Sequence, residues 1–311
     1  MSTVTAAAPV TTYLDTRGPY DLREVALMGF GHRNEHSFDG VMRLAFCVDG
    51  VYERQVGAEL RQEGERLQLR IHPLPGSPEL ADRTVAVIAN QVARVVSVDH
   101  DGVAFERMCR ADPVLARLRD MAPGFRPALF HSPYEAAIWS VISARRARNQ
   151  GIRLRARLAE AHGASFELAG ERIWAVPTPS RLAAVESVPG LPADRIPRLH
   201  AIAEAAQDGR LSVDRLTAMT PEDARKDLQS LPGIGPFYSA LIVIRACGNA
   251  DVLSVEEPMS RAAAIDLYGL DPQLSDGDYA AFAERWRPFR TWVSVMLRAV
   301  GGRAERSVDS T

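Results

Sequence analysis

Apolar and polar residues alternate in the first third of the chain, which is the pattern of short strands. Residues 41–48, 51–60 and 67–71 have the pattern expected of strands. Asp49-Gly50 and Glu63-Gly64 separate these segments and have the composition of tight turns. The pattern predicts successive antiparallel hairpins.

The segment after these hairpins mixes loop, helix and strand signals. Pro73, Pro75 and Pro78 mark a loop, residues 83–93 have helical spacing, and residues 93–105 favour a return to strand. The first domain is therefore predicted to be α+β.

From residue 112 onward, helix caps recur and strand signals almost vanish. Ser132-Pro133-Tyr134-Glu135 is a capping box with proline at the first helical position. It opens a segment whose apolar face consists of Ala137, Ile138, Val141 and Ile142. We expect a buried central helix in an all-helical second domain. Thr178-Pro179 starts a further short helix, and residues 188–207 hold another.

Leu231-Pro232-Gly233-Ile234-Gly235 lies between two amphipathic segments and predicts a helix-hairpin-helix over residues 221–247. Thr220-Pro221 starts the first helix and Gly248-Asn249 ends the second. The glycines allow a sharp turn whose amides, with the N-terminus of the next helix, can hold a phosphate. A plain helical hairpin with a glycine turn would show the same five residues.

Charge adds a second candidate for anion binding. The chain has 311 residues, is 46% hydrophobic and has a net charge of −2, so a nucleic-acid contact requires a local basic patch. Arginines gather after the central helix at Arg145, Arg146, Arg148, Arg153, Arg155 and Arg157. A solvated helix face and a surface along a DNA backbone both explain this run.

Cys47, Cys109 and Cys247 are far apart, which favours free thiols in a reducing compartment. No apolar run approaches membrane-spanning length, so we expect a cytoplasmic protein with no membrane contact, and a monomer. The predicted domains are a disordered tail over 1–12, an antiparallel α+β domain over 13–111, a helical domain over 112–300, and a second tail over 301–311.

The order of these motifs resembles the 3-methyladenine DNA glycosylase II family within the helix-hairpin-helix DNA glycosylase superfamily. The resemblance rests on Gly18-Pro19-Tyr20-Asp21, Phe130-His131-Ser132-Pro133-Tyr134-Glu135-Ala136, Val176-Pro177-Thr178-Pro179, residues 231–240 and Trp286-Arg287-Pro288-Phe289-Arg290-Thr291-Trp292. It implies an N-terminal α+β domain, then two helical subdomains with the active site between them. It also implies hydrolysis of the N-glycosidic bond of an alkylated purine that is flipped out of damaged double-stranded DNA.

In that family the catalytic carboxylate is an aspartate a short distance after the hairpin, whereas this chain has Ser254-Val255-Glu256-Glu257-Pro258 there. Alignment without a gap selects Glu257, and one extra residue selects Glu256. Glutamate reaches roughly 1.5 Å further than aspartate, and misplacement of about that size can slow catalysis about a hundredfold. Both glutamates would also suit the first turn of a following helix.

The resemblance also assigns residues to DNA contact and to a base pocket. The hairpin residues Leu231, Gly233, Ile234 and Gly235 would bind DNA, Arg145 falls at the position that wedges into the duplex, and Arg146 lies beside it. The pocket candidates are Phe237, Tyr134, Trp139, Trp174 and Arg298, although each of the four aromatic residues can belong to the core instead. A guanidinium at Arg298 would repel a cationic base unless it is paired.

Relatives that also cut the backbone place a lysine where this chain has Phe237, and the chain's only lysine is Lys226. We therefore expect a monofunctional glycosylase without lyase activity and without an iron–sulfur cluster. No other cofactor is expected, but the hairpin carbonyls can hold a monovalent cation, as in relatives. Two alternatives stay open: a DNA-binding protein that kept the scaffold but lost the chemistry, and a glycosylase for a different damaged base.

Overall fold

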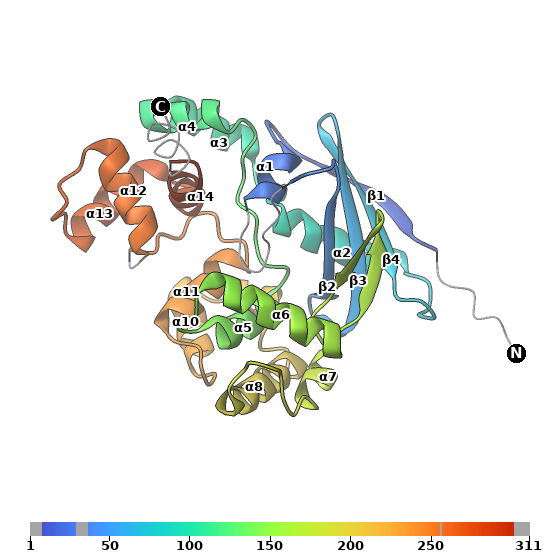
Figure 1. Ribbon diagram of the computed structural model, residues 1–311. Coiled ribbons are helices and arrows are strands. Elements are labelled where there is room, and N and C mark those ends of the chain that lie inside the picture. The colour runs from blue at the N-terminus through green and yellow to red at the C-terminus, as the bar shows by residue number, and fades with distance from the viewer. Residues whose placement is uncertain (1–7, 29–36, 256, 302–311) are drawn as a thin grey trace, which may run out of the picture.

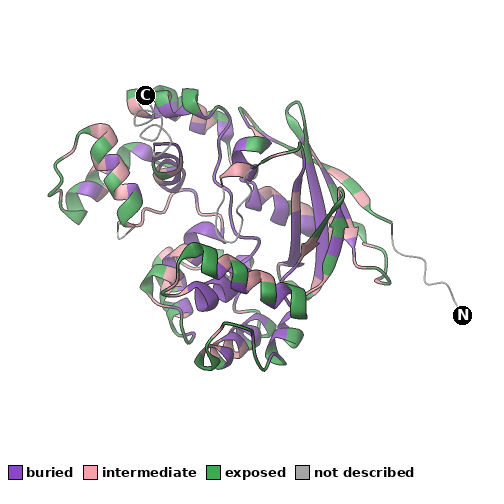
Figure 2. Ribbon diagram, viewed as in Figure 1, coloured by how far each residue is buried: buried purple, intermediate pink, exposed green. Residues whose placement is uncertain are grey.

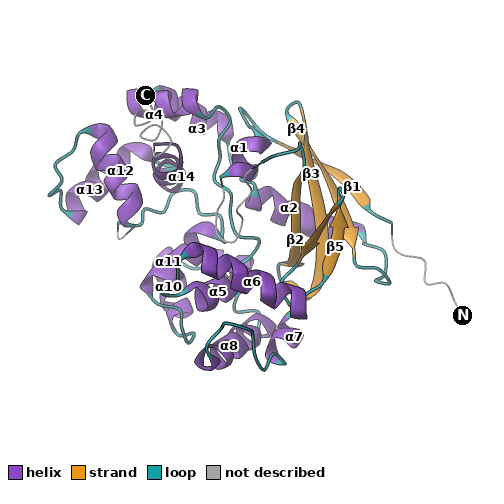
Figure 3. Cartoon of the chain, viewed as in Figure 1, coloured by secondary structure: helices purple, strands orange, loops and turns teal. Residues whose placement is uncertain are grey.

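The computed structural model describes residues 8–28, 37–255 and 257–301. A four-stranded antiparallel sheet forms one side of the molecule, and helices form the rest (Figure 1; Figure 3). The strands are β1 (Val10–Asp15), β2 (Met42–Val48), β3 (Val51–Glu63) and β4 (Arg66–Pro73), in the order β1-β4-β3-β2. Gly50 and Gly64 adopt positive φ at the two predicted turns, as tight hairpins require.

Helices α1 (Leu22–Leu27) and α2 (Asp82–Val95) pack on the sheet and share its core. The strand predicted over residues 93–105 is wrong. Helix α2 continues to Val95, and Asp101 then caps a new helix, α3 (Gly102–Arg110), by accepting hydrogen bonds from two backbone amides. Valines in this segment have strand propensity, but the cap determines the local structure.

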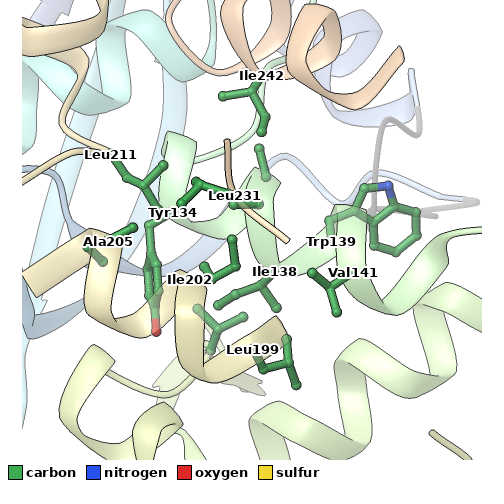
Figure 4. Packing of buried hydrophobic residues seen from close by; sticks show 14 of the residues in the cluster. Tyr134, Ile138, Trp139, Val141, Leu199, Ile202, Ala205, Leu211, Leu231 and Ile242 are labelled. Carbon is green, nitrogen blue, oxygen red and sulfur yellow. The ribbon is translucent and has the colours of Figure 1, made fainter. Parts of the chain in front are cut away.

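The predicted central helix is present as α5 (Pro133–Ser143), and all of its residues are buried (Figure 2). Ser132 caps it by accepting a hydrogen bond from the Glu135 amide at 3.2 Å. Around α5 lie α6 (Arg148–His162), α7 (Pro179–Ala183), α8 (Ile196–Gln207), α9 (Val213–Thr217), α10 (Pro221–Gln229) and α11 (Pro236–Arg245). Ile138, Leu199, Leu231 and their neighbours form the core of this helical body (Figure 4).

A second helical body has its own core, which contains Phe105, Trp286 and Trp292. It combines α3 and α4 (Pro113–Met121) with α12 (Pro258–Tyr268), α13 (Asp276–Ala283) and α14 (Arg290–Met296). Helix α3 therefore packs with the C-terminal helices. The boundary predicted between residues 111 and 112 falls between α3 and α4, which share this core.

The helical region also contains a short hairpin that the sequence pattern did not predict. Strands β5 (Ser165–Leu168) and β6 (Glu171–Trp174) pair with each other and lie against β3 and β2. The Arg43 guanidinium donates to the carbonyl of Leu168, which fixes the hairpin to the sheet. Four-residue strands are too short for an alternating pattern to be recognised.

The ends of the described chain also bear on the sequence predictions. Strand β1 begins at Val10, inside the residues expected to form a tail, and residues 1–7 and 302–311 lie outside the described residues. Cys47, Cys109 and Cys247 are buried free thiols, and burial raises the pKa of Cys109 and that of Cys247 to about 12. Within the described chain, no helix combines the length and apolar character needed to cross a bilayer.

Candidate functional site

The hairpin between α10 and α11 is a tight turn held by the core beneath it. The amide of Ile234 donates to the carbonyl of Leu231 at 3.1 Å, and Gly233 adopts φ +92°, which favours glycine. Leu231 and Ile234 are 5% and 4% exposed and pack into the core around α5. Buried side chains on both sides of Gly233 therefore fix the backbone of this turn.

Helix α11 begins at the hairpin with an N-terminus that its own chain leaves open. Gly235 is the N-cap residue and Pro236 occupies the first turn, so no side chain caps the helix. A Cβ placed on Gly235 would meet nothing within 4 Å. The first amides of a helix lack intrahelical acceptors and carry partial positive charge. This geometry suits an anion that approaches from solvent.

The monovalent cation expected at the hairpin would be held by backbone carbonyls. The carbonyl of Leu231 accepts from Ile234, and that of Gly235 accepts from Ser239. Each carbonyl keeps a second lone pair, so the turn remains compatible with a monovalent cation, which would stiffen it. Among the residues described, no group of three His, Cys, Asp or Glu side chains is arranged to hold a metal ion.

A pocket opens beside this hairpin, where α11 of the first helical body faces α12 and α14 of the second. Its volume is about 630 Å³, including the open space at its mouth. The walls are mostly apolar, with a few polar groups at the side of the second body. The lining residues are Phe237, Ala240, Leu241, Ile244, Arg245, Val252, Ser254, Glu257, Ser260, Thr291, Ser294, Val295 and Arg298. The mostly apolar lining suits a flat organic group such as a base.

Glu257 lies at the edge of this pocket as the N-cap residue of α12. Its Oε2 accepts from the Ser260 amide at 2.7 Å and from the Ser260 hydroxyl, and its Oε1 accepts from the Met259 amide at 3.2 Å. The carboxylate is therefore held in one orientation, with 20% of the side chain exposed. Glu257 both caps α12 and presents a carboxylate to the pocket.

Arg298, from the same helical body, pairs with this carboxylate. Its Nη1 lies 3.7 Å from Glu257 Oε1, and 55% of the side chain is exposed. Arg298 belongs to a π-helical turn, Leu297–Gly301, that continues α14, and such turns are frequent at functional sites. The pairing offsets the positive charge that the guanidinium brings to the pocket.

The loop before Glu257 is fastened to α14. The Thr291 hydroxyl donates to the carbonyl of Val252 at 2.7 Å and accepts from its amide at 3.0 Å. Arg290 Nε donates to Asp251 Oδ1 at 2.9 Å. Sequence reasoning missed Asp251, Thr291 and Ser260, although Arg290 and Thr291 lie in the C-terminal motif quoted above. These contacts hold the position of Glu257 relative to the pocket.

Of the predicted site residues, the structure brings Phe237, Glu257 and Arg298 together at the pocket. Phe237 lies in the first turn of α11 and is 56% exposed. Glu256 lies outside the described residues.

The three other aromatic candidates do not line this pocket. Tyr134 is fully buried, stacks with Tyr52 and donates to the carbonyl of Pro177. Trp139 packs against α6 at Gly151, and Trp174 lies in β6. Helical spacing placed Tyr134 and Trp139 on one element, but it could not tell which face of α5 meets the core.

The arginines predicted to contact DNA follow the end of α5. Arg145 is exposed and adopts φ +58°, which is rare for a residue with a side chain. Arg146 is partly buried and donates to the carbonyl of Ala144 at 3.4 Å. Both belong to the loop that joins α5 to α6.

Comparison with known proteins identifies relatives, although no family model matches the chain. DNA-3-methyladenine glycosylase of Bacillus subtilis is 28% identical over 156 residues, which are 48% of this chain and 50% of that protein. A probable bifunctional transcriptional activator/DNA repair enzyme AlkA of Mycobacterium tuberculosis is 26% identical over 305 residues, 95% of this chain and 58% of that protein. The chain thus spans about half the length of these curated relatives.

The fold comparison agrees with the sequence comparison. A 3-methyladenine DNA-glycosylase from Archaeoglobus fulgidus superimposes with a TM-score of 0.72 at 19% identity, over 92% of this chain and 96% of that one. The predicted fold class, an antiparallel α+β domain followed by a helical domain, is confirmed. With the hairpin and its order among the motifs, these similarities make the chain similar in sequence and in fold to helix-hairpin-helix DNA glycosylases.

Proposed function

We propose that this protein is a DNA glycosylase that hydrolyses the N-glycosidic bond of an alkylated purine flipped out of duplex DNA. The observation that carries the proposal is Glu257, an oriented carboxylate at the edge of an apolar pocket that also contains Phe237 from the hairpin's own helix. One helix, α11, thus joins the proposed phosphate site to the proposed base site.

The hairpin anchors the duplex in this proposal. A phosphate of the damaged strand meets the open N-terminus of α11 and the amides near Gly235, where no side chain competes for the space. Such a contact carries no sequence information, so it suits an enzyme that must work at any position in DNA.

The carboxylate acts on the sugar. As the bond between base and deoxyribose breaks, positive charge develops on the sugar ring, and a fixed anion stabilises that charge. The base leaves with the bonding electron pair, water adds to the sugar carbon, and the proton that this water loses passes to solvent. The contacts of Glu257 with Ser260 and Met259 hold the anion in place before the reaction.

The pocket supports an alkylated purine as the leaving group. Alkylation at a ring nitrogen makes the base cationic, so it leaves without help from a strong acid. The exposed face of Phe237 can favour such a cation, and the partner carboxylate of Arg298 offsets the guanidinium charge. The base excised would therefore be positively charged or electron-poor.

The residues at the site support hydrolysis without cleavage of the backbone. A lyase needs an amine near the sugar, whereas Phe237 occupies the corresponding position and Lys226 lies in α10, outside the pocket lining. We therefore propose a monofunctional enzyme that leaves an intact abasic strand.

Incubation with a duplex methylated at purine nitrogens tests this proposal. We expect free 3-methyladenine or 7-methylguanine by chromatography, strand breaks only after alkali, and no covalent adduct after borohydride treatment. Absence of any released base from mild acid to mild alkali would favour a DNA-binding protein that kept the scaffold without the chemistry. Release of a neutral damaged base alone would favour the different-lesion alternative.

A further inference from the structure

A second basic feature lies beside the hairpin, at the start of α8. A Cβ placed on Gly233 would lie 3.1 Å from Cδ of Arg198 and 3.7 Å from Cγ2 of Val141. The side chain of Arg198 therefore runs directly along the turn, and 35% of it is exposed. The hairpin, α8 and the end of α5 meet at this point.

Arg195, which directly precedes α8, connects that helix to α5. Its Nη1 donates to the carbonyl of Val141 at 3.2 Å, in the last turns of α5. Only 13% of its side chain is exposed. Since α5 ends at Ser143, this contact places Arg195 close to the loop that bears Arg145 and Arg146.

The charges of these arginines act on Arg195. Burial lowers the pKa of Arg195, and the charges of Arg198, Arg146 and Arg145 lower it further, whereas Asp194 raises it. The Asp194 carboxylate lies 3.1 Å from Nη2 of Arg198 and 3.7 Å from Nε of Arg195. Among these groups, one carboxylate raises the pKa of Arg195 and three guanidinium groups lower it.

Such an excess of positive charge is unfavourable within the folded protein, and polyanions relieve it. The chain as a whole has a net charge of −2, so this local excess is not a property of the whole chain. Arg145 also adopts a positive φ, which adds local backbone strain for a residue with a side chain. Strain and unbalanced charge therefore occur together beside the hairpin.

We propose that Arg145, Arg146, Arg195 and Arg198 form one phosphate-binding surface, here called the arginine surface, which extends the contact of the hairpin along the backbone of duplex DNA. The choice of duplex DNA as the partner of the arginine surface rests on the proposed function. The contacts that define the arginine surface do not involve the pocket. Arg198 contacts phosphate directly, and Arg195 is a positioning residue that joins α8 to α5.

The salt dependence of binding to an undamaged duplex tests this surface. Each arginine–phosphate contact contributes about 0.9 to the slope of log affinity against log salt. Between about 50 and 200 mM salt, one contact therefore accounts for about a 3.5-fold loss of affinity. We expect the slope for Arg198→Ala to be smaller than the wild-type slope by about 0.9. Arg198→Lys should keep most of the wild-type slope, because it keeps the charge. Arg61→Ala, which removes an exposed arginine of β3, should keep the wild-type slope.

Asp194→Asn provides the opposite change. Because Asp194 competes with phosphate for Arg198, its neutralisation should raise affinity by about 3-fold at low salt and steepen the slope. A purely structural ion pair would instead lower thermal stability without raising affinity. Thermal unfolding of each variant shows that the comparison concerns folded protein.

A wild-type slope in folded Arg198→Ala overturns the proposal, as does an unchanged affinity in Asp194→Asn. Loss of base release by Arg198→Ala with an unchanged slope also overturns it, because the residue would then act at the pocket. If the wild-type protein releases no base but the slope falls as expected, the arginine surface stands and the proposed enzymatic function fails.

Discussion

The N-termini of helices α11 and α12 carry the same partial positive charge, but only the N-terminus of α12 is capped by a side chain of the protein. The N-terminus of α11 has Gly235 as its cap and open space in front of it. The N-terminus of α12 is filled by the carboxylate of Glu257, which accepts from two backbone amides. Partial positive charge is thus left for an external anion at one helix and complemented by the chain's own anion at the other.

This difference explains how one molecule can bind a polyanion and still hold a carboxylate near it. A second open N-terminus at α12 would attract phosphate into the pocket. Glu257 fills that N-terminus instead, and in the proposed function its negative charge faces a cationic sugar or base. The ion pair with Arg298 moderates that charge until a ligand enters.

Conversion of the open N-terminus into a filled one should give the largest effect. In Gly235→Asp, the new carboxylate would cap α11 and repel phosphate, and the backbone at φ −90° accepts any residue. We expect duplex affinity to fall about 100-fold, or about 2.7 kcal/mol, while the unfolding free energy rises by about 1 kcal/mol. Gly235→Ala, which adds a methyl group without charge, is the matched control. Equal affinities of the two variants would contradict an anion site here.

The position of Glu257 at the N-terminus of α12 depends on the preceding loop, which is hydrogen-bonded to Thr291 of α14. Thr291→Val leaves the amide and carbonyl of Val252 without their shared partner, so the unfolding free energy should fall by about 2 kcal/mol. Urea denaturation measures this loss, and base release should fall with it because Glu257 shifts. Thr291→Ser keeps the hydroxyl and should retain both properties. A stable Thr291→Val protein would show that the loop does not rely on this residue.

Removal of the Arg298 guanidinium, which pairs with Glu257, should increase the rate of release of a cationic base relative to that of a neutral base. We expect Arg298→Met to raise the rate of 7-methylguanine release relative to that of hypoxanthine by about 10-fold, since a positive charge leaves the pocket. Single-turnover rates on the two substrates give this ratio. Arg285→Met removes the same charge outside the pocket lining and should leave the ratio unchanged. An unaltered ratio in Arg298→Met would mean that Arg298 does not influence base selection.

The smallest effect concerns α10, the helix that leads into the hairpin. Arg215 donates to both carboxylate oxygens of Asp227, and this hydrogen bonding lowers the Asp227 pKa. A depressed pKa adds stability above the ordinary aspartate range near 3.9, and that stability is lost as pH falls through the folded-state value. Asp227→Asn should therefore cost up to about 1 kcal/mol at pH 7 and progressively less below about pH 4. Denaturation curves measure this difference in unfolding free energy. A difference that stays constant with pH would exclude the Arg215–Asp227 pair as its source.

The sequence predicted those parts of the fold in which local chemistry decides the structure. Proline and glycine determine the turn at Gly233, and Ser132 with Pro133 determines the start of α5. The segment 93–105 failed because valines suit strands, whereas Asp101 starts a helix there. Strands β5 and β6 were missed because they are stabilised by packing on β2 and β3, which are distant in sequence.

The candidate site shows the same limit. The family resemblance assigned Phe237, Glu257 and Arg298 to the site, and these three meet at one pocket. Tyr134, Trp139 and Trp174 were also candidates for the base pocket, but they do not line it. Arg195 and Arg198 lie on an element with no recognisable motif, so only the tertiary structure brings them to the hairpin.

The central claim is that Glu257, at the N-terminus of α12, is the carboxylate that acts on the sugar. Single-turnover base release by Glu257→Gln and by Glu256→Gln, on a methylated duplex at saturating protein, tests it most directly. We predict that Glu257→Gln is slower by at least about 100-fold with duplex affinity retained, and that Glu256→Gln stays near the wild-type rate. A wild-type rate in Glu257→Gln would contradict the claim.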